Sequence, residues 1–458
     1  SGGLADNVNN GTLGTTNAGT LAVKNATLTN SSSGRIGLLG GVFTLTGVSS
    51  NVVNQGAILG FGTNAVVVDN RSGGSITATG GTLRLTGGLT NSVGAAANAG
   101  LLAALGAGAQ LEVAQAFTNT GTIRLNHATA TFTAPRVANA GQILGNGSFN
   151  AVLSNAVAGV VSNDGTGGTL VFNGAVDNAG NMVALNNSGL AFAQAVNNAA
   201  GGLIGVANGG TVTFNAAVTN AAQGTLGMRN QGTMVFNAGL TNNGTLGFDA
   251  ALNPSTAIIT GTLLLGSSGI ITMAHTNDTL VMRGNFVNGS TNVNEFNMRY
   301  GTMVFGGTSA TVTNTFEVAS TNKGPYMSAF ADNMALGTLN ITNHIAFVNN
   351  INNGGGLGTN ECLYVDVLHL FNGATLKLSQ LTIYVGVEFI YEDGSGTKVL
   401  THGVINEGNK DSLGLANVFI DGGGQIVFVP EPSTGVLMGL ALGVLAVSRR
   451  RRKNQPRC

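Results

Sequence analysis

Apolar and polar residues alternate over short segments along most of this chain. In the copy GTLVFNGAVDNAG, which begins at Gly168, Leu170 and Phe172 occupy alternate positions on either side of Val171. A period of two places one set of side chains on one face of a strand. Glycine and asparagine, which favour turns, separate the segments. The pattern therefore predicts many short strands that each bury one face.

The alternating segments recur with a constant phase between residues 168 and 244. The four copies read GTLVFNGAVDNAG, GLAFAQAVNNAAG, GTVTFNAAVTNAAQG and GTMVFNAGLTNNG. Each copy has an aromatic residue, an aliphatic residue two positions before it, a second aliphatic residue and an asparagine. These positions are Phe172, Phe192, Phe214 and Phe236; Leu170, Leu190, Val212 and Met234; Val176, Val196, Val218 and Leu240; and Asn178, Asn198, Asn220 and Asn242. The aromatic position advances by 20, 22 and 22 residues, which gives a repeat of about 21 residues.

This repeat predicts an all-β fold, a right-handed parallel β-helix or β-solenoid with coils of about 21 residues. A coil of this length holds three short strands, and stacking the coils ~4.8 Å apart places Phe on Phe and Asn on Asn. Weaker copies at a variable spacing extend the pattern, so we expect 18 to 20 coils in all. They begin at Gly19, Gly41, Gly62, Gly81, Gly108, Gly261 and Gly301. A β-sandwich array and a low-complexity chain that never orders are the alternatives.

The repeat fades at about Thr321, which suggests a change of organisation. We expect solenoid repeats over residues 1–320 and a terminal β region over 321–429 that caps the rod, since a solenoid needs its open end covered. Within that region, the segment Leu363–Tyr391 predicts densely packed strands. Residues 430–453 form a third part of different composition.

Composition excludes several classes of protein. Only 8% of residues are Asp, Glu, Lys or Arg, the net charge is zero and 43% of residues are hydrophobic, which argues against a disordered chain. A neutral surface also lacks the basic face that nucleic acid requires. The two cysteines, Cys362 and Cys458, predict no disulfide framework. Ser1 begins no charged and apolar leader, so a secretory signal has been removed or is not included.

The GTLxLxG copies and GATLKLSQLTIYVG, which begins at Gly373, resemble autotransporter-associated β-strand repeats. The resemblance extends over about Gly19 to Gly386. It implies a β-helix that lies outside the cell, like the passenger domain of an autotransporter.

The last residues have three successive parts: VPEPSTG from Val429, an apolar run over Val436–Val447, and RRRRK from Arg449. Two prolines keep the first part extended and accessible to a processing enzyme. The apolar run predicts a single short transmembrane helix, below the ~20 residues of a comfortable span. Arginines hold the C-terminus on the cytoplasmic side, so the body is expected outside.

This three-part tail resembles the PEP-CTERM sorting signal of Gram-negative bacteria. Its sorting residues are Pro430, Glu431 and Pro432, and its basic stop is Arg449, Arg450, Arg451 and Arg452. The resemblance implies processing by an exosortase, transient residence in the inner membrane, and association with exopolysaccharide and biofilm. A buried core helix over Val436–Val447 and a sortase substrate are the alternatives; the missing Leu before Pro430 argues against the second.

A polysaccharide lyase or hydrolase built on a β-helix is the alternative from another class, and it needs clustered carboxylates or bases. The acids before residue 250 do not recur at the coil period: Asp6, Asp69, Glu112, Asp164, Asp177 and Asp249. The histidines show no metal-ligand spacing: His127, His275, His344, His369 and His402. An offset of three residues sends Asp366 and His369 to opposite faces of a strand. Cys362 has no nucleophile signature, and Asp421, like Asp164, fits a tight turn better than a calcium site.

These observations predict no catalytic residue, no metal and no cofactor. We expect an exported structural or adhesive rod of the cell surface or extracellular matrix, made first as a precursor anchored in the inner membrane. Its partners are an exosortase and, as a candidate, exopolysaccharide, to which Asn- and Thr-rich sides would hydrogen-bond.

Overall fold

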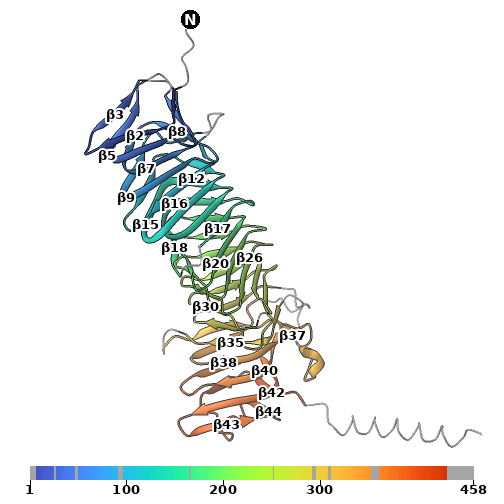
Figure 1. The fold of residues 1–458 in the computed structure, drawn as a ribbon. Helices are drawn as coiled ribbons and strands as arrows, with labels where there is room; N and C mark the ends of the chain where they lie inside the picture. Colours follow the sequence, from blue (N-terminus) through green and yellow to red (C-terminus); the bar gives the residue numbers. More distant parts are fainter. Residues whose placement is uncertain are drawn as a thin grey trace, which may run out of the picture.

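The computed structural model describes residues 7–24, 27–46, 50–90, 96–163, 167–250, 252–290, 296–307, 311–351 and 361–430. In these residues the regular secondary structure is all strand apart from one short 3-10 helix, η1 (Met327–Phe330), and turns join the strands. The strands wind into one elongated rod of about 16 turns, with β2 near one end and β43 and β44 at the other (Figure 1). The predicted all-β parallel solenoid is confirmed.

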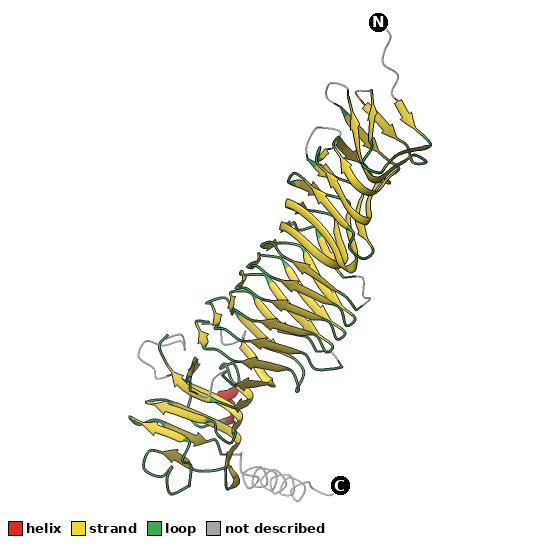
Figure 2. Cartoon of the chain, turned by 90° about the vertical axis from the view of Figure 1, so that its left-hand side faces the viewer, coloured by secondary structure: helices red, strands yellow, loops and turns green. Residues whose placement is uncertain are grey.

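A typical coil holds three strands, as predicted, and each strand pairs in parallel with its equivalent one turn away (Figure 2). Three ladders of strands therefore run along the rod. The first ladder contains β2 (Thr12–Thr16), β5 (Arg35–Leu45), β7 (Ala57–Asn64), β9 (Ser75–Leu85), β12 (Leu101–Leu105), β15 (Thr122–Asn139), β16 (Gln142–Asn155), β17 (Val160–Ser162), β20 (Asn181–Leu185), β23 (Leu203–Ala207), β26 (Thr225–Arg229), β29 (Thr245–Phe248), β32 (Ile270–Met273), β35 (Phe296–Phe305), β38 (Leu336–Ile341), β40 (Glu361–Leu370), β42 (Thr382–Asp393) and β46 (Gln425–Phe428).

The second and third ladders share the longest of these strands and add shorter ones. Strands particular to the second ladder are β3 (Thr20–Val23), β13 (Gln110–Val113), β18 (Thr169–Phe172), β21 (Gly189–Phe192), β24 (Thr211–Phe214), β27 (Thr233–Phe236), β30 (Thr256–Ile259) and β33 (Thr279–Met282). Those of the third are β1 (Asn7–Asn9), β4 (Thr27–Asn30), β6 (Asn51–Asn54), β8 (Val67–Asn70), β10 (Leu89–Thr90), β11 (Ala97–Asn98), β14 (Phe117–Asn119), β19 (Val176–Asn178), β22 (Val196–Asn198), β25 (Val218–Asn220), β28 (Leu240–Asn242), β31 (Leu263–Leu265), β34 (Phe286–Asn288), β36 (Asn314–Glu317), β39 (His344–Val348), β41 (Thr375–Ser379) and β45 (Val418–Asp421).

The interior repeats the ladders that the sequence predicts. The rings of Phe172, Phe192, Phe214 and Phe236 stack in succession, with centroids 5.3, 5.0 and 4.8 Å apart. The Asn ladder is continuous as well, because each Nδ2 donates to the Oδ1 of the asparagine one coil further on. Its members, all buried, are Asn9, Asn30, Asn54, Asn70, Asn98, Asn119, Asn139, Asn155, Asn178, Asn198, Asn220 and Asn242.

Glycine is required where a coil bends against its neighbour. Gly145 has a φ of 106°, and a Cβ there would lie 1.7 Å from the Leu125 carbonyl oxygen. Asparagine takes the left-handed conformation at other corners, as at Asn208, with a φ of 54°. Both residues adopt this region at low cost, which explains their abundance in the turns.

Parallel stacking continues beyond Thr321 to β46, with longer coils. Met298 pairs with Leu336, a step of 38 residues (336 − 298), and Leu336 pairs with Val365, a step of 29 (365 − 336). These long coils explain why the rod has about 16 turns and not the 18 to 20 expected from a uniform repeat.

Three antiparallel pairs join the parallel ladders in this last part of the rod. They link β37 (Ser320–Thr321) to β40, β43 (Gly396–Leu400) to β42, and β44 (Val404–Asn406) to β46. The division into residues 1–320, 321–429 and 430–453 stays a prediction.

Candidate functional site

The acids named from the sequence lie apart from one another along the rod. Asp69 pairs with Arg71 at 2.8 Å and Glu112 with Arg84 at 2.7 Å, while Asp177 is exposed on the strand surface. Asp6 and Asp164 lie outside the described residues. No group of three or more His, Cys, Asp or Glu side chains suited to a metal ion occurs in the part of the chain that the structure describes.

Asp366 and His369 bind different partners, although they are close in sequence. The Asp366 carboxylate accepts two hydrogen bonds from Arg299, at 2.9 and 3.3 Å. His369 Nε2 lies 2.9 Å from Glu392 Oε1, and its ring stacks on Phe371 with centroids 3.8 Å apart. Each group is therefore engaged in its own contact.

Cys362 is fully buried, and its Sγ lies 3.5 Å from the Ser320 carbonyl oxygen. Burial raises the pKa of the thiol to about 12. A protonated thiol without solvent access is a poor nucleophile, and the expectation of a small buried hydrophobe is confirmed. Asp421 lies in a tight turn, where its carbonyl oxygen accepts from the Gly424 amide at 2.9 Å.

The asparagines of the interior ladder do not reach the surface, unlike Asn215 and Asn237, which pair at the surface. Asn178, Asn198 and Asn220 are each 0% exposed, and their amides are bonded within the ladder. These ladder asparagines are therefore not available to a glycan, and the expected glycan contact of the Asn- and Thr-rich sides stays a prediction. Threonines supply the half-exposed row on the second ladder instead, one in each coil and in register. They are Thr211, Thr233, Thr256, Thr279, Thr302 and Thr338.

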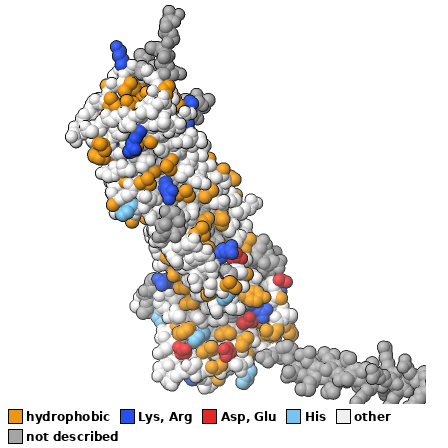
Figure 3. Space-filling view, viewed as in Figure 1, with side chains coloured by type: hydrophobic (Ala, Val, Ile, Leu, Met, Phe, Trp, Pro, Cys, Tyr) orange, Lys and Arg blue, Asp and Glu red, His pale blue; other side chains and the backbone are white. Residues whose placement is uncertain are grey.

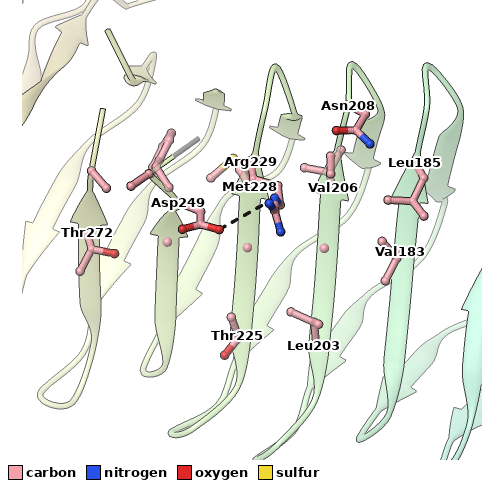
Figure 4. Close-up of a pocket in the computed structure, with 17 residues that line it drawn as sticks. Val183, Leu185, Leu203, Val206, Asn208, Thr225, Met228, Arg229, Asp249 and Thr272 are labelled. Carbon is pink, nitrogen blue, oxygen red and sulfur yellow. Dashed lines mark ion pairs between the residues drawn. The ribbon is translucent and has the colours of Figure 1, made fainter. Parts of the chain in front are cut away.

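A groove of about 830 Å³ crosses the outer face of β20, β23, β26, β29 and β32 (Figure 4). Its floor contains Gly205, Gly227 and Gly247, which are paired in register on three successive coils. The φ angles of these glycines are not left-handed, and a Cβ would meet no atom closer than 3.7, 3.7 and 3.4 Å, respectively. The backbone would tolerate side chains here, so the fold does not itself require the groove.

The groove has aliphatic walls and a polar border. Val183 and Leu203 are among its lining residues, and Thr225 and Thr272 add hydroxyls. Arg229 and Asp249, 3.9 Å apart, are 63% exposed each, so water screens their attraction (Figure 4). The arrangement offers hydrogen-bond donors and acceptors without net charge. Sequence reasoning missed it, although the glycines recur at the period of the repeat.

The other candidate site lies where the chain leaves the rod. Val429 directly follows β46, is 3% exposed, and donates its amide hydrogen to the Val385 carbonyl oxygen at 2.9 Å. Its side chain packs in a lateral cluster with Phe330, Cys362 and Tyr364. Pro430, the next residue, is exposed. The chain therefore leaves the rod at the surface, directly after the last strand.

Residues 428–453 match the PEP-CTERM protein-sorting motif. The chain carries this sorting motif. The match includes Pro430, Glu431, Pro432 and the arginine run that begins at Arg449, as the sequence predicts. A PEP-CTERM motif implies an exported protein that an exosortase sorts from a membrane-anchored precursor. No curated protein and no solved structure matches the chain.

The structure places only the beginning of the PEP-CTERM motif. Pro430 is described, whereas Glu431, Pro432, the apolar run and Arg449–Arg452 lie outside the described residues. Within the residues that are described, no helix has the length and hydropathy of a membrane span. The predicted transmembrane helix and the roles of the individual sorting residues stay predictions.

Proposed function

We propose that this exported protein is a structural or adhesive rod of the cell surface or extracellular matrix, associated with exopolysaccharide. The observation that carries the proposal is the PEP-CTERM motif joined directly to the last strand of a solenoid. A rod of about 16 coils, spaced ~4.8 Å apart, extends for roughly 77 Å and presents long faces to a matrix. Most of the visible surface is uncharged (Figure 3).

In this proposal the tail acts in two steps. The apolar run Val436–Val447 spans the inner membrane as a short helix, and Arg449–Arg452 hold its end in the cytoplasm. The exosortase then recognises Pro430, Glu431 and Pro432 on the exported side and cuts the tail. The exposure of Pro430 supports this order, because the enzyme needs access to the segment while the body is folded.

The body acts by contact and not by catalysis. Asp69, Glu112 and Asp366 each pair with an arginine, and the thiol of Cys362 is buried. A β-helix lyase or hydrolase would instead need carboxylates or bases brought together over a substrate cleft. Incubation with host exopolysaccharide is expected to release no reducing ends or unsaturated sugars; their release would favour the enzyme.

The groove over Gly205, Gly227 and Gly247 is the best candidate surface for a glycan. Backbone amides beneath it are already used in the ladders, so an added peptide strand has nothing to pair with there. The border offers hydroxyl, amide, guanidinium and carboxylate groups without net charge, which suits a neutral polyol. An extended sugar chain along the rod axis would cross several coils.

Mass spectrometry of the C-terminal peptide tests the proposal directly. Protein from the outer fraction of the native host should end near Pro432, because the exosortase removes the remainder. An intact Arg449–Cys458 end on released protein would contradict sorting. Retention of the processed protein on host exopolysaccharide, measured in parallel, tests the matrix association separately.

A further inference from the structure

The end of the rod from which the tail leaves has a border of its own. This border consists of β43, β44 and the three residues between them. We call these residues, 396–406, the terminal rim. β43 pairs in antiparallel fashion with β42, and β44 with β46. In the described part of the chain, no further strand pairs with the outer edge of either. Figure 1 places both strands at the very end of the rod.

The terminal rim is apolar in part and has no carboxylate. Val399 is 54% exposed and Val404 is 41% exposed, and Thr397 and Thr401 lie beside them on the surface. The one lysine, Lys398, is held by the Gly414 carbonyl oxygen at 2.7 Å and by Asp393 at 3.6 Å. This surface therefore presents methyl and hydroxyl groups, together with the exposed side chains of His402 and Asn406.

The tail begins next to the terminal rim. The Phe428 amide donates to the Gly403 carbonyl oxygen at 3.1 Å, and Pro430 follows two residues later. Only residues 431–435 separate Pro430 from the apolar run that begins at Val436. At ~3.6 Å per residue, the six steps from Pro430 to Val436 extend at most roughly 22 Å. A bilayer that holds the apolar run must lie within this distance of Pro430.

From this reach we infer that the terminal rim contacts the lipid headgroups in the precursor, so that the rod stands end-on upon the membrane. The inference rests on the membrane anchoring of the proposed function and adds the surface that touches the bilayer. The opposite end, with β2, lies roughly 77 Å away by the coil spacing. Only the rim end is therefore tied to the membrane.

The chemistry of the rim fits the headgroup layer better than the hydrocarbon core. The outer edges of β43 and β44 carry backbone groups that need water or another partner, and hydrocarbon supplies neither. Valines at the surface gain by leaving water for the interface. Asp393 pairs with Lys398 at 3.6 Å and Asp411 with Lys410 at 2.7 Å, so the charges beside the rim largely cancel and give no attraction to a strongly anionic surface. The fitting partner is a zwitterionic lipid surface.

The absence of tryptophan from the chain makes a clean experiment possible. The full-length precursor with Val404→Trp is reconstituted into phosphatidylcholine vesicles that contain brominated lipid, which quenches nearby indole fluorescence. Leu39→Trp, on β5 toward the other end of the rod, is the matched control because Leu39 is also exposed, at 53%. Circular dichroism establishes that both variants keep the strand content of the parent.

We expect a blue shift and at least twofold quenching for Val404→Trp, and neither for Leu39→Trp. The contact should not strengthen when anionic lipid replaces phosphatidylcholine, because the charges beside the rim largely cancel. Flotation of the protein with the vesicles measures the anchoring. If the protein floats but both variants show equally weak quenching, the rim does not contact the lipid, although the anchoring holds. Strong quenching of both would show a rod lying along the bilayer, which also overturns the inference. Failure to float would remove the anchoring itself.

Discussion

Phe214 and Phe236 stack face to face inside the rod, with ring centroids 4.8 Å apart and planes inclined by 14°. They lie 22 residues apart in the sequence and occupy the same position of successive coils. The spacing of the rings equals the spacing of the strands, so each ring fills the height of one coil. Loss of one ring leaves a gap that neighbouring coils close only by breaking their own ladders.

Phe214→Ala should therefore be strongly destabilising. Both rings are fully buried, and removal of a buried phenylalanine costs about 3–5 kcal/mol through lost burial and the cavity that remains. Phe214→Leu should cost less, since it retains most of the volume. Urea unfolding followed by circular dichroism measures both. Equal midpoints for Phe214→Ala and the parent would show that the stack is not rigidly packed.

Asn220→Ala should also destabilise the rod, by about 1–3 kcal/mol for each partner left unsatisfied. Asn220 Oδ1 accepts from Asn198 at 2.8 Å, and its Nδ2 donates to Asn242 at 2.7 Å, all in the interior. Asn237→Ala is the control, because Asn237 donates to Asn215 at 2.8 Å at the surface, where water replaces the bond. The thermal midpoint of Asn220→Ala should lie below that of Asn237→Ala. Similar midpoints would show that the buried asparagine ladder contributes no more to stability than a surface hydrogen bond does.

Glu317→Gln should flatten the dependence of stability on pH. Burial raises the pKa of the Glu317 carboxyl above its ordinary value of 4.5, and the nearby Glu361 carboxyl raises it further, against two backbone hydrogen bonds from Asn350 and Ile351. At pH values between the pKa of Glu317 in the unfolded chain and its higher pKa in the folded protein, the folded state binds more protons than the unfolded state. The contribution of Glu317 is thus fully present below pH 4.5 and is lost as the pH rises through the folded pKa.

Urea midpoints between pH 4 and pH 7 test this sign. The parent should lose stability with rising pH relative to Glu317→Gln, which keeps an oxygen for the two backbone amides. Glu407→Gln, which removes one carboxylate from the exposed surface, is the control for the loss of a negative charge. A parent slope unchanged by Glu317→Gln would refute the assignment.

The sequence predicted the repeating part of this fold well, because each coil restates the same physical solution. The regular spacing of residues such as Phe172, Phe192 and Asn178 defines the repeat. In-register stacking follows from this spacing without knowledge of distant contacts. The irregular coils after Met298 were not predictable in this way. These coils contain η1 and antiparallel partners such as β37, which no periodic pattern encodes.

Of the two candidate sites, the sorting motif could be predicted from the sequence and the groove could not. The PEP-CTERM motif is local in sequence, and its order and spacing could be read without a structure. The groove depends on which face of a strand points outward. Gly205 and Gly227 share the phase of the repeat, yet that phase alone does not distinguish a glycine in a turn from one on an open face.

Gly227→Leu should fill the groove without weakening the fold. Glycine inside a strand lowers stability, and a Cβ at Gly227 would make only ordinary contacts, the closest with Leu203 Cδ1 at 3.7 Å. The thermal midpoint should therefore stay the same or rise. Retention on host exopolysaccharide should fall severalfold, because the leucine side chain occupies the space left for a sugar.

Gly37→Leu supplies a matched control for this variant. Gly37 lies in the first ladder on β5, paired with Gly14, and a Cβ there would meet nothing closer than the Leu13 carbonyl oxygen at 3.9 Å. It should therefore change stability in the same direction while leaving retention unaltered. Equal loss of retention in both variants would indicate a general effect on the rod surface. Full retention by Gly227→Leu would move the glycan contact elsewhere, with the half-exposed threonine row from Thr211 to Thr338 as the next surface to test.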